Sequence, residues 1–207
     1  PFLIDTEILN LDARWEWYFA RQQFITAGIF YKDLENPVES IIVDVGNQRQ
    51  QSFLNAPQAT IIGAEIEAKK YFEFPDSGMS FIANKRWLVQ ANYTYSDSEV
   101  QVDASDRVFT LGGAGAPESA AFFIADGSRM QGQSEHVVNA QFGWEDDNAR
   151  SQATLIVNYV SERITARGAG VSGSREPDYI QEPGVFLDFV YRKDFTAMGR
   201  DLGFALE

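Results

Sequence analysis

The strict alternation of apolar and polar side chains is the sequence feature that most constrains how this chain can fold. In the stretch WLVQANYTYS, residues 87–96, aromatic and aliphatic residues occupy one set of alternate positions, and mainly neutral hydrogen-bonding residues occupy the other. Successive side chains of a β-strand point to opposite sides of a sheet, so this period of two predicts a strand. The same pattern fits a strand over a soluble core and a strand whose apolar face meets lipid.

Seven further segments alternate in the same way, and no segment has the period of a helix. The predicted strands are residues 9–19, 23–33, 59–72, 87–96, 134–145, 150–160, 185–194 and 201–207. The sequence therefore predicts an all-β chain of about eight strands, and the short turns between pairs of strands favour antiparallel pairing.

The connections between these strands alternate in length. Residues 20–22, 146–148 and 195–200 are short and turn-like, residues 73–85 are intermediate, and residues 34–58, 97–133 and 161–184 are long. Long structureless loops are uncommon in compact soluble domains. Outer-membrane barrels have short periplasmic turns and long extracellular loops, so the connections favour a transmembrane barrel wall.

The aromatic residues form two bands along the predicted strands. The band beside the short connections is Trp15, Trp17, Phe19, Phe24, Phe72, Trp87, Phe142, Trp144 and Phe195. The band beside the long loops is Tyr31, Tyr93, Tyr95 and Tyr159. Aromatic girdles form at both edges of the hydrocarbon layer, so the bands predict that the apolar face meets lipid. The alternative is an aromatic-rich soluble core.

Composition excludes several classes of protein. The formal net charge of −13 argues against a nucleic-acid partner, whose phosphates require a basic surface. The chain has no cysteine, which excludes a disulfide scaffold and thiolate metal sites. The chain contains no run of about eighteen apolar residues, so the sequence predicts no transmembrane helix. No signal peptide is visible, and such a segment would lie upstream of Pro1.

With the strands placed, several motifs resemble one family. Residues 8–38 resemble a hairpin from the C-terminal half of a TonB-dependent receptor barrel, in which an N-x-D strand ends in an aromatic pair and the return strand ends in F-Y-K-D. Those elements are Asn10 and Asp12, Tyr18-Phe19, and Phe30-Tyr31-Lys32-Asp33. Supporting stretches are NA at 55–56, GAEIE at 63–67, ANYTYS at 91–96, HVVN at 136–139 and LGFALE at 202–207.

The resemblance implies both an architecture and a function. Such receptors have barrels of about 22 strands, plugged by an N-terminal domain. Residues 1–207 would then be a partial barrel domain that lacks the plug and the final strands. The implied function is uptake of a scarce solute, such as a ferric siderophore, across the bacterial outer membrane with energy from the TonB system. The rival is a small, complete eight-stranded barrel acting as a porin or an adhesin.

The same resemblance implies the partners. They are outer-membrane lipid and lipopolysaccharide, TonB through the missing plug, and a small-molecule solute. No cofactor is expected. The residues themselves predict no enzyme, because the single histidine, His136, lies in a strand on the apolar-alternating face and no nucleophile motif accompanies it. No catalytic or metal site is predicted, since zinc needs several nitrogen or sulfur ligands.

Two groups of residues are candidate binding sites. The polar strand face predicts seven lumen-facing residues, which are Glu65, Glu67, Lys69, Gln90, Asn92, Asn139 and Gln141. These side chains would contact a plug or a solute, or pair with neighbouring strands. The long loops predict a ligand-binding set because loops carry recognition: Phe109, Phe122, Phe123, Arg129, Arg163, Arg167, Arg175 and Tyr179. The alternatives are that the aromatics pack beneath their own loop and that the arginines are surface charges.

An acidic run opens the longest predicted loop. Asp97, Glu99, Asp103 and Asp106 offer oxygen ligands of the kind that calcium takes, but their spacing lacks the full calcium-loop pattern. A solvated loop is the favoured interpretation.

Overall fold

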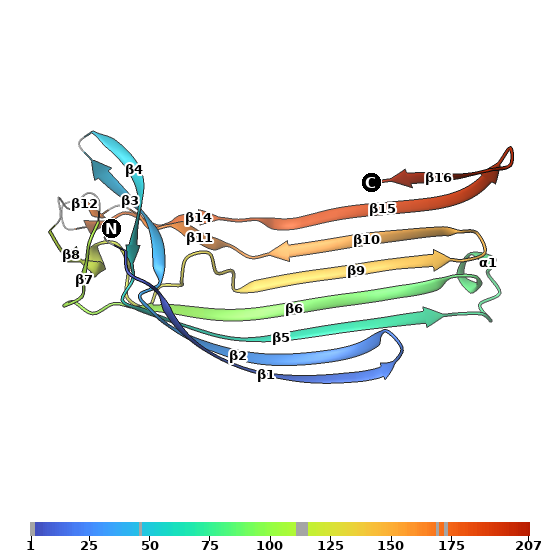
Figure 1. The fold of residues 1–207 in the computed structure, drawn as a ribbon, viewed down its shortest axis with the longest axis horizontal. Coiled ribbons are helices and arrows are strands. Elements are labelled where there is room, and N and C mark those ends of the chain that lie inside the picture. The colour runs from blue at the N-terminus through green and yellow to red at the C-terminus, as the bar shows by residue number, and fades with distance from the viewer. Residues whose placement is uncertain (1–2, 46, 111–115, 169, 172–173) are drawn as a thin grey trace.

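An open antiparallel sheet of eight strands dominates the structure, a computed structural model that describes residues 3–45, 47–110, 116–168, 170–171 and 174–207 (Figure 1). The strands are β1 (Glu7–Ala20), β2 (Gln23–Glu35), β5 (Gln58–Glu73), β6 (Arg86–Gln101), β9 (His136–Asp146), β10 (Ser151–Val160), β15 (Gly184–Ala197) and β16 (Arg200–Leu206). They lie in that order across the sheet, so each strand pairs with the next along the chain. The predicted all-β, antiparallel fold class is confirmed.

The sheet does not close on itself within the part of the chain that the structure describes. Strands β1 and β16 form its two edges, whereas a complete eight-stranded barrel requires them to pair. Strands β5 and β6 have 16 residues each, more than the roughly 9–11 that cross a bilayer. Both strands therefore extend beyond the length of a membrane span at one end or both.

The register aligns like side chains across the sheet. Asn92 lies opposite Glu67 and Asn139, and Trp87 lies opposite Phe72 and Trp144. Paired residues project from the same side of a sheet. The sheet consequently has a polar face, which includes Asn92 and its register partners, and an apolar face, which includes Trp87 and its register partners.

The apolar face is exposed. Val89 is 41% exposed and Leu155 is 39% exposed, and neither Ala91 nor Val138 is buried. Exposed large side chains continue along this face from Trp15 to the strands at the other edge. A soluble sandwich would bury these positions beneath a second layer, so the alternative of a soluble core is wrong.

The buried core lies instead at the end of the sheet that carries the long loops. Its sheet members include Leu34, Ala59 and Val100, which share one register row on the polar face. The loop members pack over this row, and they are Ile41, Val43, Leu54, Ala56, Val102, Val108, Ala120, Phe123 and Ile124. The long loops therefore fold inward, over the polar side of the strand ends.

The sequence predicts structureless long connections, and this prediction is wrong, because all three contain strands. Residues 34–58 hold a hairpin of β3 (Val38–Val45) and β4 (Gln48–Asn55). The next connection holds β7 (Arg107–Val108), β8 (Glu118–Ser119) and η1 (Ala120–Phe122), and the last holds β11 (Arg163–Ala166), β12 (Gly170–Val171), β13 (Ser174–Arg175) and β14 (Tyr179–Gln181). Period-two alternation does not reveal these strands, because β3 is buried on both sides at its middle, β4 begins with four polar residues, and the others have two to four residues.

The acidic run is divided between two elements. Asp97 and Glu99 lie within β6, which continues to Gln101. Asp103 and Asp106 lie in the turn that follows, where the Asp106 carboxylate accepts the Asp103 backbone N–H at 2.7 Å. The prediction of a loop from residue 97 is wrong, because the β5–β6 ladder runs as far as Gln58 and Gln101.

The connection between β5 and β6 contains the one α-helix of the described residues, α1 (Ser80–Ala83). It lies at the end of the sheet with the tight turns, opposite the long loops (Figure 1). No helix in the described parts of the chain is long and apolar enough to cross a membrane.

Candidate functional site

The polar face presents a wall of amide and carboxylate side chains. All seven residues predicted to face a lumen lie on this side, in register rows such as Lys69–Gln90–Gln141 and Glu67–Asn92–Asn139. Gln90 donates a hydrogen bond from Nε2 to Glu67 Oε1 at 3.0 Å, and Asn139 donates one from Nδ2 to Asn92 Oδ1 at 2.8 Å. None of the seven is buried. Amide groups paired in this way keep further donors and acceptors for a solute or a protein surface.

The polar face continues onto β1, where Arg14 forms a group of ion pairs with carboxylates. The Arg14 guanidinium lies 2.8 Å from Glu16 and 3.5 Å from Glu65, and it donates to the Thr26 hydroxyl at 3.4 Å. The side chains of Arg14, Glu16 and Glu65 are roughly half exposed, so their mutual attraction is weakened by solvent. Arg14 therefore orients neighbouring carboxylates more than it stabilises the fold.

Above this wall stands a folded assembly of the three long connections. We call the hairpin β3–β4 together with the described residues of 102–133 and 161–183 the loop cap. It gathers at the end of the sheet where these connections leave the strands (Figure 1). The hydrophobic core described above joins the first two connections to the sheet, and a buried ionic cluster joins the third.

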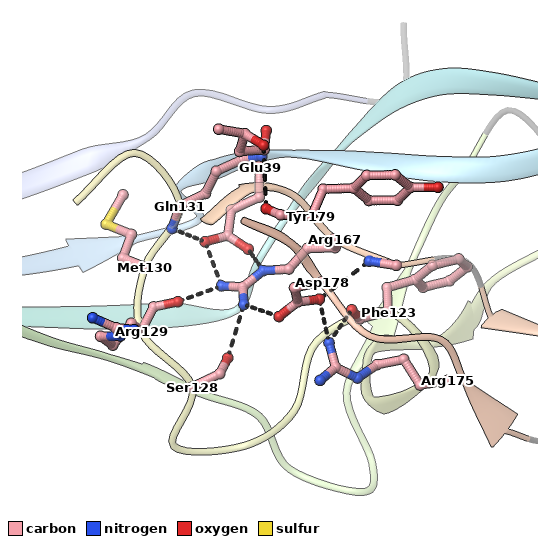
Figure 2. Close-up of polar contacts among 12 residues, drawn as sticks. Glu39, Phe123, Ser128, Arg129, Met130, Gln131, Arg167, Arg175, Asp178 and Tyr179 are labelled. Atoms are coloured by element: carbon pink, nitrogen blue, oxygen red, sulfur yellow. Dashed lines mark hydrogen bonds and ion pairs between the residues drawn. The ribbon is translucent and has the colours of Figure 1, made fainter. Parts of the chain in front are cut away.

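Arg167 is the centre of that ionic cluster (Figure 2). Its side chain and that of Glu39 are both fully buried. Nε and Nη2 of Arg167 donate to the two carboxylate oxygens of Glu39 at 2.6 and 2.9 Å. Nη1 donates to Asp178 Oδ2 and Ser128 Oγ, both at 3.1 Å, and Nη2 also donates to the Arg129 carbonyl at 2.8 Å. One guanidinium thus contacts all three long connections.

The two carboxylates that pair with Arg167 accept further hydrogen bonds from other groups. Glu39 Oε1 also accepts the Gln131 backbone N–H at 3.0 Å. Asp178 Oδ1 accepts the Gly168 backbone N–H at 3.1 Å and Nη1 of Arg175 at 2.6 Å. Two arginines and two carboxylates give a neutral cluster in which the charges are paired and hydrogen-bonded. Buried charges are tolerated in that condition.

Backbone contacts reinforce the cluster. The Arg167 N–H donates to the Ser40 carbonyl at 2.9 Å, and the Ile42 N–H donates to the Arg167 carbonyl at 3.1 Å. Burial alone would lower the pKa of the Arg167 guanidinium, but the hydrogen bond and charge of Glu39, together with Asp178, raise the pKa overall. Arg167 is therefore a permanent cation at the centre of the loop cap.

The structure separates the residues predicted for ligand binding into three groups. Arg167 and Phe123 are buried, so their position gives them a structural role in the loop cap. Arg129, Arg175 and Arg163 are partly exposed and already hold polar partners, which are Glu162, Asp178 and Gln181. The third group consists of exposed aromatic side chains, Phe109, Phe122 and Tyr179, each 43% exposed.

Sequence reasoning missed two residues of the cluster. Glu39 lies near the start of β3, between Val38 and Ser40, and Asp178 lies in the last long connection. Neither residue has a clear signal in the sequence, because Glu39 is followed by Ser40 and β3 contains a second carboxylate, Asp44. The partner could not be identified, because Glu39 and Arg167 are 128 residues apart in the chain.

His136 lies at the loop end of the apolar face. Its Nδ1 is 2.9 Å from the Tyr93 hydroxyl, and its ring stacks on Tyr93 and lies 5.5 Å from that of Tyr95. Rings with a polar edge are suited to a boundary between apolar and aqueous surroundings. This surface position gives the imidazole a packing role.

The family described as "TonB dependent receptor-like, beta-barrel" matches residues 6–195, which run from the start of β1 to near the end of β15. Comparison with curated proteins and with solved structures gave no match. The family match covers most of the sequence and agrees with the exposed apolar face, the polar wall and the alternation of tight turns with long loops. The chain belongs to the TonB-dependent receptor-like β-barrel family.

Proposed function

We propose that this chain forms part of the wall and mouth of an outer-membrane receptor that takes up a scarce solute with energy from the TonB system. The family is one of outer-membrane transporters and not of enzymes. The observation that carries the proposal is a polar wall, lined by Gln90, Asn92 and their register partners, beneath a folded loop cap. A transport path needs a hydrophilic interior, and recognition needs an ordered mouth.

The partners follow from this placement. The apolar face meets outer-membrane lipid and lipopolysaccharide, and the polar wall faces a lumen. Residues 1–207 then form a partial barrel domain, and a plug domain supplied from elsewhere in the protein fills the lumen and contacts TonB. The carboxylates of Glu65 and Glu67 lie on the wall where they would meet such a plug or a passing solute.

The solute would contact the exposed aromatic groups of the loop cap. Phe109, Phe122 and Tyr179 present rings, and Arg163 and Arg129 present guanidinium groups nearby in the same connections. Rings and guanidinium groups together suit an anionic or aromatic ligand, such as a ferric siderophore. Arg167 would act indirectly, by holding the connections that carry these groups.

Uptake measurements test the proposed function. Cells that express the intact receptor should accumulate radiolabelled iron from at least one of a panel of ferric siderophores, and a protonophore or loss of TonB should abolish the uptake. The purified receptor should be nearly silent in planar bilayers, because a plugged barrel does not conduct. Free ion conductance together with uptake that is independent of TonB would instead establish a passive porin and overturn the proposal.

A further inference from the structure

The connection between β5 and β6 differs from every other described connection at its end of the sheet. The β1–β2, β9–β10 and β15–β16 connections there are tight turns, whereas residues 74–85 form a longer segment that carries α1 in its second half. Three of its large apolar side chains are exposed: Phe74 by 48%, Met79 by 58% and Phe81 by 61%. We call residues 74–85 the turn-side lobe.

The turn-side lobe is held against the apolar face. The Phe81 ring lies 6.2 Å from the ring of Trp87 and 6.4 Å from that of Trp144, and both tryptophans belong to the apolar face. The Phe74 ring stacks on Phe72, the register partner of Trp87, at 6.4 Å. The exposed rings of the lobe therefore extend the aromatic band beyond the ends of the strands.

A buried lysine fixes the lobe in this position. Lys85 is 8% exposed, and its ammonium lies 3.8 Å from the centroid of the Phe81 ring and 4.4 Å from that of Trp144. The ammonium also donates to the Phe81 carbonyl at 2.9 Å. Cation–π contacts of this kind hold α1 to the strand ends.

The other side of the lobe is polar. A hollow beside it is lined mainly by polar and charged side chains, including Glu73, Arg86 and Glu145, which lie on the polar face of the sheet. The lobe is thus amphipathic, with aromatic and Met side chains continuous with the apolar face and polar groups toward the opposite side. Elements with this division of side chains lie in the headgroup layer of a membrane.

We infer that the turn-side lobe is an interfacial anchor that inserts Phe74, Met79 and Phe81 among the phospholipids of the leaflet at the tight-turn end of the barrel. The inference rests on the proposed function, which places the apolar face in lipid. Phospholipid is the occupant because the exposed rings are continuous with that face. The anchor would fix the height of this side of the barrel in the membrane.

Depth-dependent fluorescence quenching tests the inference, using the intact receptor in phosphatidylcholine vesicles. An NBD label on Met79→Cys should lose most of its fluorescence to lipids that carry a doxyl group near the headgroup. A label on Leu187→Cys, which is 66% exposed on the apolar face, should be quenched by doxyl groups near the chain ends. A label on Asn148→Cys, in the tight β9–β10 turn, should be quenched by aqueous iodide and little by either lipid.

The three positions separate the two proposals. If Leu187 is quenched by lipid but Met79 responds like Asn148, the membrane placement holds and the anchor inference is overturned. If neither Leu187 nor Met79 is quenched by lipid, the membrane placement fails, and the inference fails with it.

Discussion

Replacing Arg167 by methionine should loosen the loop cap while leaving the eight-stranded sheet assembled. The substitution leaves Glu39 buried beside Asp178 without its guanidinium partner, and breaking a buried ion pair costs about 3–5 kcal/mol. Hydrogen exchange of the backbone amides should show this loosening, because that free energy corresponds to roughly a hundredfold or greater loss of protection from exchange. The loss should appear at Ser40–Ile42 of β3 and at Gln131, while protection along β5 and β6 is unchanged.

Arg49→Met is the matched control. Arg49 also joins the β3–β4 hairpin to the last long connection, through Glu176, but both side chains of this pair are exposed to solvent. Exposed ion pairs contribute little, so this variant should exchange like the unmodified protein. The double variant Arg167→Met with Glu39→Leu should recover part of the lost protection, because no unpaired Glu39 carboxylate remains. Equal protection in Arg167→Met and Arg49→Met would refute the central role of Arg167.

Arginine at the middle of the apolar face should oppose insertion of the barrel into a bilayer. Val157 lies in a register row with Ala140 and Leu187, midway between the two aromatic bands. An arginine at the bilayer midplane of such barrels costs about 2–4 kcal/mol. Urea titration followed by tryptophan fluorescence in phospholipid vesicles should show that Val157→Arg lowers the free energy of unfolding by that amount.

Asn158→Arg provides the comparison at the same depth. Asn158 is adjacent in the chain but lies on the polar face, in register with Asn139. A guanidinium there would enter the aqueous lumen, so the folding free energy should change little. Similar losses in both variants, or a larger loss for Asn158→Arg, would contradict the assignment of the two faces.

The sheet could be predicted because its faces differ along the whole length of every strand. Each of the eight predicted strands is present, and the errors lie at the ends, as where β2 continues to Glu35 and β6 to Gln101. Those added residues project alternately toward the loop core and outward, as Val100 and Glu99 do. Charged residues at the strand ends look like loop residues when sequence is the only guide.

The loop cap could not be predicted, because its order depends on contacts that sequence periodicity does not encode. Ile41, Ile42 and Val43 are consecutive apolar residues in β3, and such a run does not alternate. Phe123 resembles an exposed recognition residue in sequence, yet it is 4% exposed because the loop folds back onto the strand ends. The same folding buries Arg167, which in sequence resembles its neighbours Arg163 and Arg175.

A cysteine scan of β6 tests most directly whether this sheet is a membrane wall. Residues 1–207 contain no cysteine, so a spin label can be placed at one position at a time from Leu88 to Tyr93. The scan uses the intact receptor in phospholipid vesicles, with any cysteine elsewhere in it replaced by serine. Labels at Val89, Ala91 and Tyr93 should collide with oxygen dissolved in lipid, and labels at Leu88, Gln90 and Asn92 should collide with an aqueous nickel reagent. That alternation is the predicted result, and uniform accessibility to the nickel reagent at all six positions would contradict it.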